Sequence, residues 1–390
     1  MSFTIPESPT IRINALVQKL KAEGKVVYNL SVGEPVIATP QIIRDAARRA
    51  IDEDKTSYPP AAGIPELRSA VASWISESHG CSYTADQIVI TPGGKSALYF
   101  LLQTILEKND EVLVIAPYWV TYPAVISIFG GVPKIVETEP QAHWKVTVDA
   151  LEAAYSTQTK ILILNNASNP TGILYTRDEL CAILTWAKEK GIVVISDEVY
   201  SGLVYEGEFV SCGSFKEFED NVYVVQSASK NFGMTGWRIG ILAGNSEVLK
   251  KVTAVLSQSV SGVTTISQWA LLEGLRHKAE ICSLINQEFK TRKDSCVRLI
   301  RELFRTEIEV PASGLYVFLP LTVFGSTNET SVEWTERILK EAGVATVPGS
   351  AFGMEGYVRL SFGGKIEETE AGLRALLVYF KSDFTDKALL

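Results

Sequence analysis

Short apolar runs rich in Val and Ile recur through the first two thirds of the chain and alternate with longer amphipathic stretches. The runs show little alternation of polar and apolar residues. This pattern is typical of strands covered on both faces, as in parallel sheets flanked by helices. We therefore predict strands at residues 88–90, 112–115, 161–164, 192–195, 222–225 and 239–242.

Two of the intervening stretches carry helix signals. Pro65 can occupy the first turn of a helix. The apolar residues after it recur on one helical face: Leu67, Val71, Trp74 and Ile75. Residues 178–190 predict a second helix, which Gly191 ends. Alternation of strands and helices of this kind implies an α/β layered domain.

The last third of the chain has a different pattern. Strands are predicted at residues 314–321, 345–348 and 357–362, and helices at residues 331–342 and 366–380. This order, with strands and helices less regularly interleaved, predicts a second domain of the α+β class.

Composition excludes several classes of protein. The chain has 390 residues, of which 46% are hydrophobic and 21% are charged, so it has the composition of a folded protein rather than a disordered one. Its net charge of −8 argues against a nucleic-acid binder, which usually carries a basic surface. The five cysteines are widely spaced without a CxxC pair, which argues against disulfide and zinc frameworks and favours a reducing compartment.

No segment of the sequence predicts export or membrane insertion. The first ten residues lack a charged stretch followed by an apolar one, and no run reaches 18 apolar residues. We therefore expect a cytoplasmic protein that does not cross a membrane.

The motif TPGGKS at residues 91–96 follows a predicted strand and precedes an apolar helical run. Its glycines allow backbone N–H groups to approach an anion, and the start of a helix adds the positive end of a dipole. The ending GKS is similar to a P-loop, but that motif needs a glycine where Val89 stands, so we exclude an NTPase. An ordinary Gly-rich turn remains the alternative.

Polar groups follow three further predicted strands. Asp197, in SDEVY, lies where α/β folds place ligands, although Asp is also a common helix cap. In SASKNFGMTGWR, residues 227–238, the hydroxyls and Arg238 suit a phosphate, and Lys230 follows an apolar strand that can desolvate its amine. A solvated surface lysine is the alternative. The segment NNASNPTG, residues 165–172, offers an amide or simply a turn.

A single cofactor explains these four strand ends together. They carry a phosphate-type backbone, an amide, a carboxylate, and a lysine with an arginine. Pyridoxal phosphate has a phosphate, a ring nitrogen and an aldehyde that needs a lysine. Independent structural explanations for all four are improbable.

The motifs resemble those of the pyridoxal-phosphate-dependent aminotransferases of type I fold, class I, and especially the bacterial-type aspartate aminotransferases. The resemblance runs over nearly the whole chain and rests on LSVGEP (30–35), SYPPAAGIPELR (57–68), TPGGKSAL (91–98), APYWVTYP (116–123), SNPTG (168–172), SDEVY (196–200), SASKNFGMTGWRIG (227–240), VPGSAFG (347–353) and VRLSF (358–362). It implies an α/β large domain, residues 35–280, with a mostly parallel central sheet flanked by helices. Residues 1–34 and 281–390 would form a smaller α+β domain.

The resemblance also implies roles at the cofactor ring. Lys230 would bind the cofactor aldehyde as a Schiff base and then move protons on the substrate. Asp197 would pair with the ring nitrogen, Asn169 and Tyr200 would bond the ring hydroxyl oxygen, and Trp119 would stack on the ring.

The phosphate and the substrate would be held by further residues that the resemblance implies. The phosphate would lie against Ser227, Ser229, Arg238 and the backbone of Gly94 and Lys95, with Tyr58 of a neighbouring subunit, which implies a homodimer. Arg359 would grip the substrate α-carboxylate, and Gly33, Trp119 and Asn169 would lie beside the substrate. Lys95, or more weakly Arg12, could read a distal carboxylate, and each could instead face solvent.

The implied activity is ping-pong transfer of an amino group from an L-amino acid, expected to be aspartate, to a 2-oxo acid, expected to be 2-oxoglutarate. An aromatic or prephenate-type aminotransferase and a carbon–sulfur β-lyase remain open. Val36 and Ile37 stand where the family often has Asp-Phe, which leaves the reaction class intact but bears on substrate choice. Cofactor-binding regulators of this fold carry an N-terminal DNA-binding domain, for which the start of LSVGEP at residue 30 leaves no room.

Overall fold

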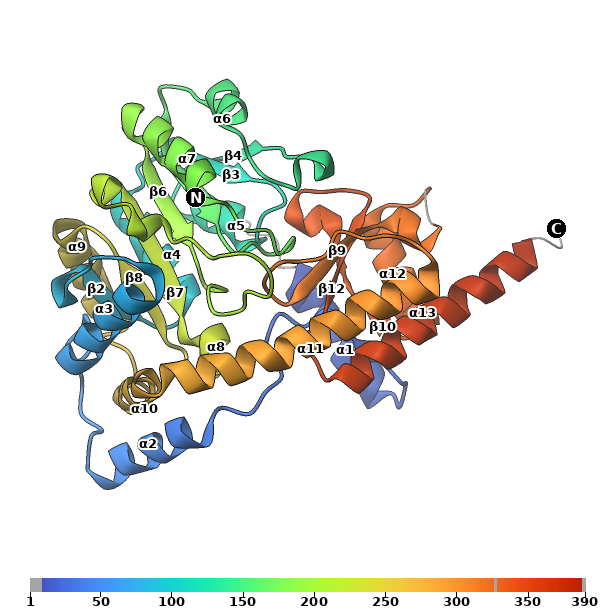
Figure 1. The fold of residues 1–390 in the computed structure, drawn as a ribbon, viewed down its shortest axis with the longest axis horizontal. Coiled ribbons are helices and arrows are strands. Elements are labelled where there is room, and N and C mark those ends of the chain that lie inside the picture. The colour runs from blue at the N-terminus through green and yellow to red at the C-terminus, as the bar shows by residue number, and fades with distance from the viewer. Residues whose placement is uncertain (1–8, 326–327, 388–390) are drawn as a thin grey trace.

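A seven-stranded sheet, the central sheet, organises the larger part of the computed structural model, which describes residues 9–325 and 328–387 (Figure 1). Its strand order is β2-β8-β7-β6-β5-β3-β4. The strands of the central sheet are β2 Ile88–Thr91, β3 Glu111–Ile115, β4 Val132–Val136, β5 Thr159–Asn165, β6 Val193–Asp197, β7 Val222–Ser227 and β8 Gly240–Ala243. The six predicted strands of this region are therefore confirmed, with boundaries shifted by one to two residues.

The sheet is mostly parallel, as predicted, with β8 as the exception. β8 pairs antiparallel with both β2 and β7, whereas the other neighbouring pairs are parallel. Residues 228–239 join β7 to β8 and include only the four-residue helix α8, Ala228–Asn231. A parallel arrangement would need a full crossover helix there, so the chain instead turns back beside β7.

Helices cover both faces of the central sheet and explain the uninterrupted apolar strands. In β5, Ile161 and Ile163 join a buried cluster with α4, α5 and α9, whereas Leu162 and Leu164 join the cluster that includes α3 and α7. Because successive side chains point to opposite faces, each of these four residues is buried. The helices are α1 Pro9–Ala22, α2 Gln41–Asp52, α3 Pro65–His79, α4 Gly94–Ile105, α5 Thr121–Ile128, α6 Val148–Ala154, α7 Arg177–Glu189, α9 Ser246–Ser259, α10 Thr265–Arg276, α11 Lys278–Phe304, α12 Ser331–Glu341 and α13 Ile366–Lys387.

Local signals placed the predicted helices correctly. Pro65 is at the first position of α3, and the helix predicted at residues 178–190 is α7. Thr176 caps α7 by accepting a hydrogen bond from the N–H of Glu179, and Gly191 follows the helix in a left-handed conformation with φ of +67°.

Two strand predictions need correction. β4 escaped prediction because Pro133 and Lys134 interrupt its apolar pattern, which an edge strand tolerates. The strand predicted at residues 345–348 is two short strands in different sheets. β10, Val344–Ala345, pairs with β1, Tyr28–Asn29, and β11, Val347–Pro348, pairs with β12, Tyr357–Ser361.

The C-terminal third forms smaller sheets beside the central one. β11, β12 and β9, Tyr316–Pro320, make an antiparallel three-stranded sheet, and β1 brings the N-terminal region to β10. Figure 1 shows the long α11 extending from the side of the central sheet towards these strands, and α13 packs along it. The division into residues 35–280 and residues 1–34 with 281–390 stays a prediction.

Arg292 of α11 connects its helix to two other segments of the chain, one at Val36 and one at residues 363–364. Its guanidinium donates to the carbonyl oxygens of Val36 at 3.2 Å, Gly363 at 3.0 Å and Gly364 at 2.5 Å. Only 9% of Arg292 is exposed, and hydrogen bonds from a buried charged group are strong. The N-terminal segment and the turn after β12 are therefore fixed to the same helix.

We predict that residues 1–10 contain no export signal. Of these, residues 1–8 lie outside the described residues. In the described parts of the chain, 9–325 and 328–387, no helix has the length and apolar character needed to cross a membrane. Those same residues contain no cluster of three or more His, Cys, Asp or Glu side chains suited to a metal ion.

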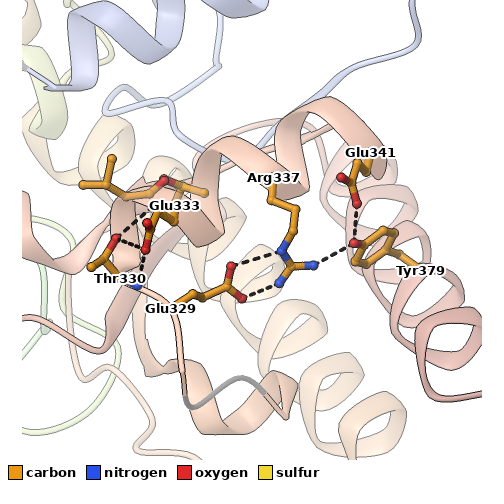
Figure 2. A network of polar contacts seen from close by, with 8 residues as sticks. Glu329, Thr330, Glu333, Arg337, Glu341 and Tyr379 are labelled. Atoms are coloured by element: carbon orange, nitrogen blue, oxygen red, sulfur yellow. Dashed lines mark hydrogen bonds and ion pairs between the residues drawn. The ribbon is translucent and has the colours of Figure 1, made fainter. Parts of the chain in front are cut away.

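A polar network fastens α12 to α13 (Figure 2). Arg337 of α12 donates two parallel hydrogen bonds to the carboxylate of Glu329 and a third to the Tyr379 hydroxyl on α13, at 2.7 Å. Tyr379 in turn donates to Glu341 at 2.5 Å. The bond to Glu329 is the main reason that the pKa of Arg337 is raised above its usual range.

We expect Arg337→Ala to lower the free energy of unfolding by about 1–3 kcal/mol, because it removes charge-assisted bonds that are largely shielded from water. The control is Arg298→Ala, which removes an exposed pair with Glu302 within α11 and should cost under about 0.5 kcal/mol. Denaturant unfolding of both variants measures the difference. Equal losses in the two variants would contradict a structural role for the network.

Candidate active site

A cavity of about 480 Å³ opens at the carboxyl ends of β5, β6 and β7, a volume typical of small-molecule sites. Side chains from both the central sheet and the C-terminal strands line it. The predicted residues that line the cavity are Gly33, Gly94, Lys95, Trp119, Asn169, Asp197, Tyr200, Ser227, Ser229, Lys230, Arg238 and Arg359. The structure therefore brings together residues that are distant in the sequence.

Asp197 provides a buried carboxylate at the end of β6. It is 4% exposed, and its Oδ2 accepts a hydrogen bond of 2.7 Å from the hydroxyl of Tyr122 on α5. Burial raises the pKa of Asp197 to about 6, and the bonds from Tyr122 and from the N–H of Val199 oppose that rise. The carboxylate is thus mostly ionised at neutral pH although it lies away from water.

Lys230 extends into the cavity from α8 and donates a hydrogen bond of 2.5 Å to the carbonyl oxygen of Gly33. The pKa of Lys230 is lowered to about 8, mainly by burial; the charge of Glu34 opposes the shift, and the charges of Arg359 and Arg238 add to it. An appreciable fraction of this amine is therefore neutral at neutral pH, which is the form that attacks a carbonyl carbon.

An anion-binding turn forms one end of the cavity. Gly93 has φ of +90°, and a Cβ at this position would lie 2.2 Å from Nη2 of Arg238, so only glycine lets the guanidinium lie against the turn. α4 begins at the next residue, and the N–H groups in the first turn of a helix have no partners within it. These donors and Arg238 converge on the lining of one cavity.

The two serines of the lysine motif complete this end. Ser227 Oγ donates to the carbonyl oxygen of Ile239 at 3.1 Å and accepts from the N–H of Ser229. Both serines are buried against the cavity. Hydroxyls, a guanidinium and helix N–H groups together suit a phosphate.

Arg359 and Asn169 line another part of the cavity. Arg359 is 3% exposed and donates to Oδ1 of Asn169 at 3.0 Å and to the carbonyl oxygen of Ser31 at 3.1 Å. Its Nε is buried without a hydrogen-bond partner, and burial lowers the pKa of the guanidinium. A guanidinium can only donate, so Asn169 turns its oxygen to Arg359 and keeps its NH₂ group for another acceptor.

A pair of tyrosines also lines the cavity. The hydroxyl oxygens of Tyr200 and Tyr316 are 2.8 Å apart, and both residues line the cavity. Burial raises the pKa of Tyr200 well above its ordinary value, so its hydroxyl is a neutral donor.

Three predicted residues have less central positions. Nζ of Lys95 lies 4.9 Å from the ring centroid of Trp119 at the cavity, and burial lowers the pKa of this lysine. Tyr58 is 92% exposed and lies outside this cavity, beside a separate depression of about 420 Å³. Arg12 lies on α1 with 58% of its side chain exposed, at 3.6 Å from Glu336, and does not line the cavity.

The lining residues that sequence reasoning did not single out include Glu34, Tyr122, Asn165 and Tyr316. Glu34 and Asn165 stand inside motifs that pointed to the site, so their neighbours were a usable signal. Tyr122 likewise stands inside the motif APYWVTYP, whereas Tyr316 stands among apolar residues of β9, where nothing local separates it from core residues.

Comparison with known proteins places this geometry in context. Residues 25–376 match the profile of the family described as aminotransferase class I and II. The chain is 37% identical to a probable aspartate/prephenate aminotransferase of Aquifex aeolicus, over 95% of each chain, and 37% identical to the aspartate/prephenate aminotransferase of Thermus thermophilus, over 94% of each. A solved structure of aspartate aminotransferase from Thermus thermophilus with maleate has a TM-score of 0.92 at 36% identity, covering 97% of this chain and 99% of that one.

We expect the cofactor-free Asp197→Asn protein to gain stability over the parent as the pH rises. The folded-state pKa of Asp197, about 6, exceeds its ordinary value of 3.8, so the parent loses stability between about pH 4 and pH 6 while the neutral amide does not. The difference in unfolding free energy should therefore grow by about 2 kcal/mol between pH 4 and pH 7.

Denaturant unfolding at several pH values measures this difference. Asp149→Asn, at an exposed aspartate of α6, is the control that removes a carboxylate without removing a buried one. A difference between Asp197→Asn and the parent that does not change with pH would show that Asp197 is not held as a strained, buried carboxylate.

Proposed function

Since the chain belongs to the aminotransferase class I and II family, we propose that it transfers the amino group of L-aspartate to 2-oxoglutarate with pyridoxal 5′-phosphate as its cofactor. The observation that carries the proposal is one cavity lined by a half-buried amine of lowered pKa, Lys230, a buried carboxylate, Asp197, a turn suited to an anion, and Arg359.

The residues present fit this cofactor at each of its polar groups. The turn at Gly93 suits its phosphate, because the Arg238 guanidinium lies against this turn and the unpartnered N–H groups at the start of α4 lie beside it. Asp197 suits its ring nitrogen, and the NH₂ of Asn169 and the hydroxyl of Tyr200 suit its ring oxygen. Trp119, on the cavity wall, offers an aromatic face for stacking.

When bound, the cofactor supplies an electrophilic carbon and a ring that withdraws electrons from the substrate Cα. Lys230, with a pKa of about 8, takes the proton from Cα and returns it, and general acid–base catalysis of this kind contributes about 10²–10⁴-fold. Arg359 binds the substrate α-carboxylate through the donors of its guanidinium, which lines the cavity. Asp197, which Tyr122 helps to keep ionised, holds a negative charge opposite the ring nitrogen.

The proposed preference for aspartate rests on Lys95 and on the relatives. Nζ of Lys95 is held at the cavity over the ring of Trp119, where it can meet a distal carboxylate. Arg12 is the weaker candidate, because it is exposed and close to Glu336. Two relatives are named aspartate/prephenate aminotransferase, which supports a prephenate-type oxo acid as the second candidate substrate.

We also propose that the enzyme is a homodimer in which each subunit completes the site of the other. Tyr58 lies in the segment between α2 and α3, almost fully exposed, beside a depression formed with residues 260–266. A tyrosine left this exposed supports the prediction that it reaches the phosphate of a neighbouring subunit.

Half-reaction spectra against a panel of amino acids test the proposal. In the parent protein, aspartate should convert the cofactor to its amino form at lower concentration than alanine or phenylalanine. In Lys95→Ala, the half-saturating concentration of aspartate should rise about tenfold or more, while that of phenylalanine changes less than about twofold, because only aspartate loses a charged partner.

Lys250→Ala, at an exposed lysine of α9, is the control and should leave both concentrations unchanged. An equal effect of Lys95→Ala on both amino acids would remove Lys95 from the recognition of the substrate side chain. Release of pyruvate without any oxo-acid acceptor would instead identify a carbon–sulfur β-lyase and contradict the proposed transfer.

A further inference from the structure

Tyr316 of β9 contacts two of the predicted site residues, Tyr200 and Arg359. It is 2% exposed and lines the cavity wall. Its hydroxyl oxygen lies 2.8 Å from that of Tyr200, and its ring centroid lies 4.0 Å from the guanidinium carbon of Arg359. One side chain thus meets the tyrosine that faces the cofactor and the arginine that faces the substrate.

The hydroxyl pair acquires a direction when a ligand is bound. Each phenol has one O–H to donate. If Tyr200 donates into the cavity, its bond with Tyr316 can form only with Tyr316 as the donor. A hydroxyl whose oxygen accepts a hydrogen bond is polarised and donates more strongly, so the second tyrosine strengthens the first.

The ring of Tyr316 has a separate effect on Arg359. A guanidinium over an aromatic face is attracted to it, and the attraction is greater where both groups are buried. Phe352 lies 4.9 Å from the same guanidinium carbon, so Arg359 is held by two rings while its Nε stays without a partner. The charge that would bind a carboxylate is therefore held by two rings and by the neutral oxygens of Asn169 and Ser31, and not by an acidic side chain.

Gly33 provides the room for this arrangement. A Cβ at Gly33 would lie 3.3 Å from the hydroxyl of Tyr316, closer than most side-chain contacts. The same glycine accepts the hydrogen bond from Lys230, so the N-terminal segment contacts both groups.

The charged and titratable groups around the tyrosine pair come from four elements. The charge of Asp197 on β6 raises the pKa of Tyr200 and that of Arg359 on β12 lowers it, and Tyr200 in turn raises the pKa of Tyr122 on α5. Nζ of Lys230 on α8 lies 5.8 Å from the ring centroid of Tyr200. A substrate carboxylate on Arg359 would therefore change the field that the pair experiences.

We propose that Tyr316 is a positioning residue that links Tyr200 to Arg359, its hydroxyl setting Tyr200 as a donor to the ring oxygen of the cofactor and its ring holding Arg359 for the substrate carboxylate. The inference rests on the proposed function, because it assigns the direction of the hydroxyl pair from the cofactor's place in the cavity.

Two substitutions separate the hydroxyl from the ring. Tyr316→Phe keeps the ring and removes the donor to Tyr200, and Tyr316→Leu removes both. The control is Tyr205→Phe. It removes a half-buried hydroxyl that donates to the carbonyl oxygen of Gly314 at 2.6 Å, and Tyr205 does not line the cavity. Each protein is loaded with pyridoxal 5′-phosphate. Two quantities are then measured for each protein. The first is the pH midpoint of the change in visible absorbance of the bound cofactor, and the second is the dissociation constant of succinate, a dicarboxylate without an amino group.

In Tyr316→Phe the pH midpoint should rise by roughly 0.5–1 unit, the size that one net hydrogen bond corresponds to, because a weaker donor stabilises the negative ring oxygen less. Succinate binding should stay within about twofold of the parent. In Tyr316→Leu the midpoint should rise as well, and succinate binding should weaken about tenfold or more. Tyr205→Phe should change neither quantity.

A midpoint in Tyr316→Phe equal to that of the parent would overturn the role of the hydroxyl. Since Tyr316→Phe preserves the packing of the ring, this result stands even if Tyr316→Leu does not fold. Unchanged succinate binding in a folded Tyr316→Leu protein would overturn the role of the ring. If the parent itself develops no visible absorbance with the cofactor, the proposed function fails, and the inference fails with it.

Discussion

The structure depends on keeping one lysine amine largely out of water. Burial at the end of β7 disfavours the ammonium form of Lys230, and the buried Arg359 adds a like charge, so the pKa of the amine falls to about 8. Asp197 is the converse case, a carboxylate whose pKa burial raises to about 6 and which Tyr122 helps to keep charged. Each arrangement costs folding free energy, and functional sites commonly retain such costs. As a result, an amine that is partly neutral at neutral pH and a fixed negative charge line the same small cavity.

Two parts of the chain must meet for this volume to exist. The central sheet supplies the lysine, the carboxylate and the anion-binding turn, whereas β9 and β12 supply Tyr316 and Arg359. The segment at Gly33 lies between them and accepts the bond from Lys230. Arg292 fixes that segment and the turn after β12 to α11 through the carbonyl oxygens of Val36, Gly363 and Gly364. The position of Arg359 relative to Lys230 is thus stabilised by a buried guanidinium outside the cavity.

Much of this could be predicted from the sequence, because the relevant signals are local. Strands buried on both faces have unbroken apolar runs, and polar motifs directly after them must gather at one edge of a parallel sheet, as Asp197 and Lys230 do. The rest depends on tertiary contacts. The reversed direction of β8 follows from the short connection that contains α8, and the role of Tyr316 follows from the approach of β9 to Tyr200. Neither feature changes the pattern of nearby residues, so no local rule could find it.

The most direct test of the account is to locate the covalent bond between the cofactor and the protein. Protein loaded with pyridoxal 5′-phosphate is reduced with borohydride, digested and sequenced by mass spectrometry, with Lys230→Arg as the matched control. The account predicts a pyridoxyl group on the side chain of residue 230 in the parent protein and none at that position in the variant. A reduced parent protein that carries no label on Lys230, or carries it on another lysine, would contradict the assignment of the site.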